Sequence, residues 1–200
     1  FPKVITEIKG LRGLNVTIPY KEEIIPYLDK LSKTAKKIGA VNCVTISKKK
    51  KLKGYNTDYH GFKKSIKPLL KDHHKKALIL GTGGASKAIA YALRNLKIEY
   101  DFVSRTADEF QYKYEELDAS IFEEYTIIIN TTPVGTHPNV DDCPNLDYSL
   151  FTKKHIAYDL IYNPEETAFL RKTKAQGAVT KNGYEMLVLQ AEKAWKIWNE

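Results

Sequence analysis

The 200-residue sequence predicts an α/β protein with a small N-terminal α/β lobe, a parallel sheet built from βαβ units, and a closing C-terminal helix. Three observations carry this prediction. After residue 74, short β-branched runs alternate with amphipathic stretches. The first of these runs meets its helix at a glycine cluster, GTGGAS. Before residue 75, strand-like segments flank a turn rich in lysine.

An extended segment and a strand open the chain. In NVTIPYK, residues 15–18 place apolar side chains on alternate positions, as in a half-buried strand. Pro19 cannot donate to a sheet, so the strand should end there. A short pair of helices is then expected over residues 22–38, closed by Gly39, because EEIIPYLDKL has helical spacing.

A hairpin follows this helix pair. The segments AVNCVTI and LKGYN lie on either side of Lys48–Lys51, which we interpret as a solvated turn. The stretch HGFKKSIKPLLKD then predicts a helix that leads out of the lobe.

From residue 75 the pattern is that of a right-handed parallel sheet. The successive segments are KALILG, ASKAIAYALRNL, EYDFVS, TIIINTTP and IAYDLIYNP. The last stretch, GYEMLVLQAEKAWKIW, predicts a helix packed on a core. Its apolar positions are Met186, Leu187, Leu189, Ala194, Trp195 and Trp198.

Composition excludes several classes of protein. The 42% hydrophobic and 28% charged content is ordinary for a globular domain. No apolar run reaches the length of a membrane span and no signal peptide opens the chain, so we expect a cytoplasmic protein without a membrane partner. Because the chain starts with Phe1 inside an apparent element, we also expect a fragment. The two cysteines, Cys43 and Cys143, are expected to be free thiols, and the five histidines lack zinc-binding spacing, so no metal is expected.

The net charge of +8 raises the question of nucleic acid. The lysines are scattered, however, and their one dense run falls in the predicted hairpin turn. We therefore expect no nucleic-acid partner, although the positive field would attract small anions.

The glycine cluster predicts dinucleotide binding. Gly81, Gly83 and Gly84 come directly after an apolar strand and directly before a helix. In that context the first glycine permits the turn and the second lets backbone N–H groups approach a pyrophosphate. Ser86 stands at the third position of the fingerprint, and a purely structural tight turn is the alternative.

The next strand indicates which dinucleotide. Instead of the acid that grips a ribose hydroxyl in NAD-binding proteins, EYDFV runs into Ser104, Arg105 and Thr106. A guanidinium and two hydroxyls suit a 2′-phosphate and favour NADP. Asp108 and Glu109 oppose this interpretation, and a surface arginine without a ligand is the alternative.

Three polar clusters, NVTIPYK, GAVN and GYNTD, end apolar strands and could converge on a hydroxylated ligand. Together with GTGGAS, SRT, NTTPVG, YDLIYNP and NGYEMLVLQ, they resemble the shikimate dehydrogenase family in order and spacing along essentially the whole chain. The fold that the resemblance implies is an N-terminal substrate-binding lobe (1–74), a Rossmann-type NADP-binding domain (75–182) and a C-terminal helix (183–200) that returns to the first lobe.

The resemblance implies reversible hydride transfer between NADPH and the C3 carbonyl of 3-dehydroshikimate, in the pathway of aromatic amino-acid biosynthesis. It makes Lys21 and Asp58 the catalytic pair. The implied substrate contacts are Thr17, Lys21, Asn42, Asp58, Tyr162 and Gln190. The implied cofactor contacts are Gly81, Thr82, Gly83, Gly84, Ala85, Ser104, Arg105, Thr106, Leu160 through its backbone, and Gly183.

Elementary chemistry agrees with this pair. Reducing a ketone builds negative charge on its oxygen, which an ammonium can stabilise and protonate, and a carboxylate can orient the ammonium. Whether Lys21 is a general acid or an electrostatic clamp stays open. Taken alone, Lys21 also fits a solvated lysine and Asp58 a turn-forming residue.

One feature of the family is not matched. Its opening strand carries an S-x-S motif that holds the substrate carboxylate, and Phe1 starts after that point. We therefore expect the 200-residue chain to bind NADP but to turn over shikimate poorly, unless the full protein supplies that segment. A quinate/shikimate dehydrogenase that accepts NAD or NADP and a non-catalytic ligand-sensing relative are the alternatives, and a homodimer stays open.

Overall fold

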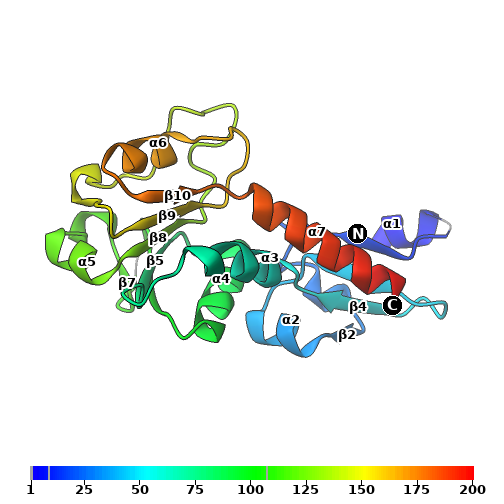
Figure 1. Cartoon of the computed structure of the whole chain (residues 1–200). Helices are drawn as coiled ribbons and strands as arrows, with labels where there is room; N and C mark the ends of the chain where they lie inside the picture. The colour runs from blue at the N-terminus through cyan, green and yellow to red at the C-terminus, as the bar shows by residue number, and fades with distance from the viewer. Residues whose placement is uncertain (1, 9, 107) are drawn as a thin grey trace.

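A computed structural model describes residues 2–8, 10–106 and 108–200. Its two β-sheets lie at opposite ends of the molecule, and three helices run between them (Figure 1). These helices are α3 (Asp58–Ile66), α4 (Gly84–Asn95) and α7 (Tyr184–Asn199). We call the parts around the two sheets the first and second lobes, in chain order.

The first lobe holds a four-stranded sheet in the order β1-β3-β4-β2. Its strands are β1 (Gly13–Asn15), β2 (Lys30–Leu31), β3 (Cys43–Ile46) and β4 (Leu52–Tyr55). β3 pairs antiparallel with β1 and β4, whereas β2 pairs parallel with β4. The predicted hairpin is confirmed, because the lysine turn joins β3 to β4 and the Ser47 N–H donates to the Lys51 carbonyl at 2.9 Å.

The opening of the chain differs from the prediction. Helix α1 (Pro2–Glu7) replaces the expected extended segment. The first strand ends at Asn15, and Ile18 is 67% exposed, so the strand predicted over 15–18 was placed too late in the chain. Alternation of apolar residues could not separate strand from the loop that follows it, because Val16 is still buried beside the sheet.

The predicted helix pair is only half right. The first half contains a 3₁₀ turn, η1 (Ile25–Tyr27), because Pro26 has no N–H for a longer helix, and β2 follows. The second half is helix α2 (Lys33–Ile38). The side chain of its N-cap residue, Ser32, accepts from the Ala35 N–H at 3.1 Å. As predicted, the helix ends at Gly39, which has φ +73°.

The second lobe holds a parallel six-stranded sheet in the order β10-β9-β8-β5-β6-β7. This is a doubly wound order, and its direction reverses between β5 and β8. Four strands were predicted: β5 (Lys76–Leu80), β6 (Glu99–Val103), β8 (Ile127–Asn130) and β9 (Ile156–Asp159). The short elements β7 (Gln111–Tyr112), α5 (Ala119–Glu124), α6 (Ala168–Ala175) and β10 (Val179–Lys181) were not.

Both faces of this sheet are covered. Successive residues of each strand point to opposite faces, so each strand contributes to two separate cores. On one side Ala77 and Ile79 pack with Phe62 of α3. On the other side Leu78 and Leu80 pack with residues of α5 and α6. Helix α3 therefore joins the second lobe's core, although it follows the first lobe's last strand.

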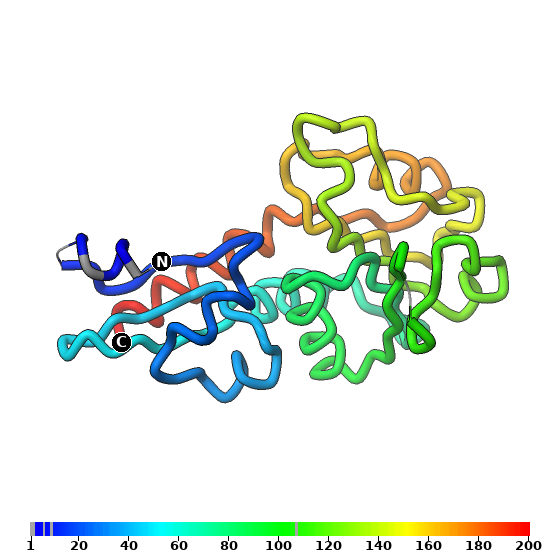
Figure 2. The backbone as a smooth tube through the Cα atoms, turned by 180° about the vertical axis from the view of Figure 1, so that it is seen from behind, coloured from blue at the N-terminus to red at the C-terminus, as the bar shows by residue number. Residues whose placement is uncertain are grey.

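Helix α7 returns from the second lobe to the first and runs beside the first sheet (Figure 2). Near its end the Trp198 indole N–H donates to the Val44 carbonyl of β3 at 3.0 Å. The prediction that Trp195 packs on the core is wrong, since this side chain is 66% exposed. Within the described ranges, no helix combines the length and apolar character needed to cross a bilayer.

Candidate active site

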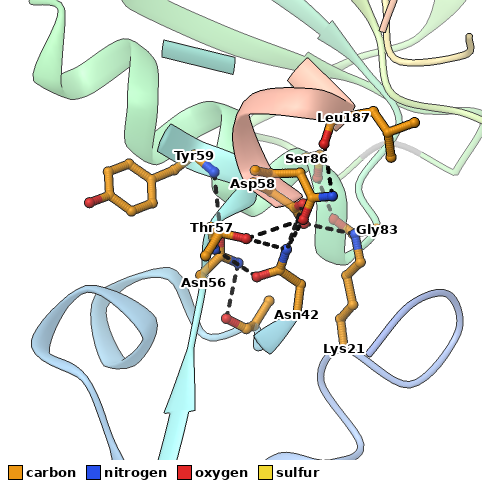
Figure 3. A network of polar contacts seen from close by, with 11 residues as sticks. Lys21, Asn42, Asn56, Thr57, Asp58, Tyr59, Gly83, Ser86 and Leu187 are labelled. Carbon is orange, nitrogen blue, oxygen red and sulfur yellow. Dashed lines mark hydrogen bonds and ion pairs between the residues drawn. The ribbon is translucent and has the colours of Figure 1, made fainter. Parts of the chain in front are cut away.

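Lys21 and Asp58 form an ion pair where the two lobes meet (Figure 3). The Lys21 Nζ atom lies 2.8 Å from Asp58 Oδ2, and the side chains are only 13% and 8% exposed. Lys21 lies in the loop after β1, where its carbonyl accepts from the Val41 N–H at 2.7 Å, and Asp58 is the first residue of α3. The pairing places an ammonium and a carboxylate, from separate elements, in a sheltered position.

Asn42 orients the carboxylate. Its Nδ2 donates to Asp58 Oδ1 at 2.8 Å and to the Thr57 hydroxyl oxygen at 2.9 Å. Its Oδ1 accepts from the Thr57 backbone N–H at 2.6 Å. Both ends of the amide are thus used, which fixes the side chain and with it the rotamer of Asp58.

Gln190 connects helix α7 to this network. Its Oε1 accepts from Asn42 Nδ2 and from the Thr57 hydroxyl, each at 3.2 Å. Its Nε2 donates to the Leu187 carbonyl at 3.0 Å. The C-terminal helix therefore contributes directly to the site, 148 residues away from Asn42 in sequence.

The charges of the site are arranged for donation to a ligand oxygen. An ammonium carries three N–H donors. In the part of the chain that the structure describes, Asp58 is the one hydrogen-bond acceptor recorded for Lys21. The remaining N–H groups of Lys21 can therefore serve a ligand.

A cavity of about 540 Å³ opens beside the pair. All six residues expected to contact the substrate line it: Thr17, Lys21, Asn42, Asp58, Tyr162 and Gln190. Three of the expected cofactor residues also line it: Ala85, Leu160 and Gly183. The cavity thus extends from the first lobe's network to the edge of the second sheet.

The glycine turn joins β5 to α4 through a left-handed glycine and an extended one. Gly81 has φ +97°, a conformation that favours glycine, and its N–H donates to the Val103 carbonyl at 2.9 Å. Gly83 is extended and precedes the first residue of α4, and a Cβ built on it would meet no atom within 4 Å. Buried Ser86 bonds back to the Gly83 carbonyl at 2.7 Å. The space beside Gly83 at this helix start is therefore open, and the positive end of the helix favours an anion there.

The Ser104–Thr106 turn lies outside the cavity lining. Its Thr106 N–H donates to Ser104 Oγ at 3.2 Å, and Arg105 is exposed. Asp108, which seemed to oppose a phosphate, is turned into its own loop: its carboxylate accepts from the Phe110 N–H at 3.0 Å and from Gln111 Nε2 at 2.8 Å. The guanidinium is therefore available to a ligand beside this turn.

Gly183 has no room for a side chain. A Cβ built on it would stand 2.0 Å from the Leu160 carbonyl oxygen, and its own N–H donates to the Ile161 carbonyl at 3.0 Å. The loop after β9 and the start of α7 are thus pressed together at the cavity wall. Only glycine permits this approach.

Sequence reasoning assigned no role to the loop after β8, although it lines the cavity through Thr131, Thr132, Pro133 and Thr136. The signal was present: NTTP follows a central strand at the point where the sheet order reverses, which is where open α/β sheets bind ligands. Asn130 shapes this loop, since its Oδ1 accepts from the Thr132 N–H at 3.0 Å and the Thr132 hydroxyl at 2.6 Å.

Asp159, at the end of β9, stands behind that loop. It is fully buried and accepts from Asn130 Nδ2 at 3.1 Å, the Ile161 N–H at 3.1 Å and the Thr167 hydroxyl at 2.7 Å. Burial raises the pKa of this carboxyl to about 6. Among the described residues, no group of three or more His, Cys, Asp or Glu side chains could hold a metal ion.

Comparison with known proteins decides the family. The family model described as the shikimate dehydrogenase substrate binding domain matches residues 1–44. A shikimate dehydrogenase (NADP(+)) of Caldanaerobacter subterraneus subsp. tengcongensis is 42% identical over 207 residues, an alignment that covers 94% of this chain and 72% of the relative.

The chain belongs to the shikimate dehydrogenase family. Solved structures of shikimate dehydrogenases agree. The Aquifex aeolicus structure superposes with a TM-score of 0.88 at 38% identity, over 100% of this chain and 77% of that one. The Thermus thermophilus structure, in complex with NADP(H) and shikimate, gives 0.85 at 35% identity, over 99% and 77%. The chain thus spans about three quarters of the length of these shikimate dehydrogenases.

Proposed function

We propose that this protein catalyses the reversible, NADPH-dependent reduction of 3-dehydroshikimate to shikimate. The observation that carries the proposal is the Lys21–Asp58 pair, 2.8 Å apart, at the wall of a cavity that also reaches Ala85 of the glycine turn and Gly183. Family membership supports the same reaction, since relatives that are about 40% identical carry the name shikimate dehydrogenase (NADP(+)).

Each polar group of the pair has a task. NADPH, when bound, supplies the hydride. Lys21 donates an N–H to the carbonyl oxygen, stabilises the negative charge that grows there, and supplies the proton in the reductive direction. Asp58 holds the ammonium through Oδ2 and accepts from a neighbouring hydroxyl of the ring. Asn42 fixes Asp58 through its Nδ2, and its Oδ1 has a second lone pair that accepts from another ring hydroxyl.

The remaining assignments belong to this proposal. Thr17, Tyr162 and Gln190 contact the substrate from the two lobes and α7. The glycine turn, Gly81 to Ala85, holds the pyrophosphate, Ser104 to Thr106 hold the 2′-phosphate, and Leu160 and Gly183 flank the nicotinamide. Residues 1–74 form the substrate-binding part, residues 75–182 the NADP-binding domain, and residues 183–200 the returning helix of a cytoplasmic enzyme. The open space beside Gly83, the exposed Arg105 and the cavity lining support these assignments.

Steady-state assays of the purified protein test the proposal. Formation of NADPH or NADH is followed with shikimate or quinate, each paired with NADP⁺ or NAD⁺. We expect shikimate with NADP⁺ to give the highest kcat/KM. A higher kcat/KM with quinate, or with NAD⁺, would contradict the proposal and indicate a quinate/shikimate dehydrogenase. Shikimate binding without turnover in any pairing would indicate a ligand-sensing protein, against which the presence of both Lys21 and Asp58 argues.

A further inference from the structure

The segment that carries Lys21 is docked against the first turn of helix α4. A Cβ built on Gly84 would stand 3.4 Å from Lys21 Cβ and 3.4 Å from Glu22 Oε1. A methyl group would touch both atoms, so little space is left between this segment and the helix. Gly84 was expected to serve a pyrophosphate, yet its surroundings show that it also admits the opposite lobe.

An ion pair closes the same contact. The Glu22 carboxylate in the first lobe pairs with the Lys87 ammonium of α4 in the second lobe. Their side chains are 43% and 40% exposed, so the pair stands at the rim of the cleft. Because Glu22 directly follows Lys21, whatever holds Glu22 also limits where the Lys21 backbone can move.

Apolar packing continues the contact further along α4. Ala88 is buried together with Ile38 and Ala40 of the first lobe. Tyr59 and Tyr91 pack against this cluster edge to face, with ring centroids 5.3 Å apart. The lobes are thus joined by a small apolar contact, and the ion pair lies between it and the glycine turn.

The charge of Glu22 bears on the cofactor as well. Its carboxylate stands beside the start of α4, where backbone N–H groups favour an anion. With NADPH bound in this arrangement of the lobes, the carboxylate and the pyrophosphate would share this positive end. Lys87 offsets the repulsion between them.

We propose that Glu22 and Lys87 form an inter-lobe clamp that positions Lys21 over the glycine turn. The role of Glu22 as a positioning residue rests on the proposed function, whereas the clamp itself does not. The clamp contributes two effects: it narrows the range of inter-lobe distances, and it balances one negative charge beside the pyrophosphate site.

Pulsed electron paramagnetic resonance tests the clamp without turnover. Spin labels replace the exposed Lys49 and Lys153, one in each lobe, with Cys143→Ser as background. Glu22→Gln, Lys87→Gln and the double variant should broaden the distance distribution equally, and the charge-reversed pair Glu22→Lys with Lys87→Glu should narrow it again. Glu166→Gln, which breaks the 2.9 Å ion pair with Lys174 inside the second lobe, is the matched control and should leave the distribution unchanged.

NADPH fluorescence titration supplies the second readout. Glu22→Gln should tighten NADPH binding and Lys87→Gln should weaken it, each by about two- to fivefold, the range of exposed ion pairs. In turnover both single variants should lower kcat by a similar factor with little change in KM for shikimate. Wild-type distance distributions in the single variants, or equal shifts of NADPH affinity in the same direction, would overturn the clamp. A wild-type protein that binds NADPH but oxidises shikimate at no detectable rate, rather than at the low rate expected of these 200 residues, would instead overturn the proposed function and leave these two tests intact.

Discussion

The Nζ atom of Lys21 lies 2.8 Å from Oδ2 of Asp58, although 37 residues separate the two in sequence. The first lobe's sheet brings them together: the loop after β1 and the start of α3 meet at Asn42, which precedes β3. An acid and a base held by three different segments keep their geometry only while the lobe stays folded. The pair is therefore a sensitive probe of both chemistry and structure.

Lys21→Met should abolish most activity without unfolding the protein. The variant keeps the apolar stem but removes the donor, so kcat should fall by about 10²- to 10⁴-fold. Asp58 keeps its bond from Asn42, which limits the loss of stability. Lys51→Met is the control. It makes the same substitution and also removes a lysine–aspartate ion pair, the 2.7 Å pair with Asp29 at the exposed hairpin, and should leave kcat unchanged. A loss of only a few-fold in Lys21→Met would reject Lys21 as proton donor.

Gly183→Ala should destabilise the junction between β9 and α7. The added Cβ would stand 2.0 Å from the Leu160 carbonyl oxygen, and relieving that collision should cost about 1–3 kcal/mol in the free energy of unfolding. Gly83→Ala is matched to it, since φ is −75° and no atom lies within 4 Å of the new Cβ. Denaturant titration should show little change for Gly83→Ala, while NADPH titration should show weaker binding. Equal stability of both variants would contradict the close packing of Gly183 on Leu160.

The strand, glycine turn and helix of the second lobe could be predicted because their signals are local. KALIL is apolar throughout its last four residues, and GTGG follows it directly. The helix expected from residue 22 does not form, because Pro26 lacks the N–H that a continuous helix would need there, despite the helical spacing of apolar residues. Trp195 fits the apolar pattern of α7, but which face is covered depends on neighbours that sequence does not specify.

The candidate site follows the same division. Lys21, Asn42 and Asp58 were named because the resemblance joined motifs that no local rule connects. The contact of Gln190 with Asn42, and the pairing of Glu22 with Lys87, depend on how the lobes meet. No periodicity or spacing contains that information.

Arg105→Gln should lower the preference for NADP over NAD. The exposed guanidinium has the geometry to meet a 2′-phosphate with charge-assisted hydrogen bonds, so its loss should weaken NADPH binding by about tenfold or more. NADH, which lacks that phosphate, should bind equally well to both proteins. Fluorescence titration with the two nucleotides measures this, and Arg94→Gln, at an exposed position on α4, is the control. Equal losses for NADPH and NADH would place Arg105 elsewhere than at the 2′-phosphate.

Asp159→Asn should stabilise the protein most at neutral pH. Burial raises the folded-state pKa of Asp159 to about 6 from an ordinary value of 3.8. Between these two values the folded chain binds a proton that the unfolded chain releases, so the wild type loses stability as pH rises from about 4 to about 6. The uncharged amide avoids this loss. The advantage of Asp159→Asn in the free energy of unfolding should grow by on the order of 1 kcal/mol between pH 5 and pH 7.

The sign of this pH dependence can be checked against a second carboxyl. Asp118 caps α5, where bonds from the Ser120 hydroxyl and the Ile121 N–H lower its pKa. Its contribution is present at neutral pH and is lost as pH falls, so Asp118→Asn should be less stable than the wild type at pH 7 and should approach it in acid. Urea unfolding of all three proteins across this range measures both differences. If the Asp159→Asn difference did not change with pH, the three donors around Asp159 would hold its carboxylate as well as water does, and burial would not be the dominant influence on it.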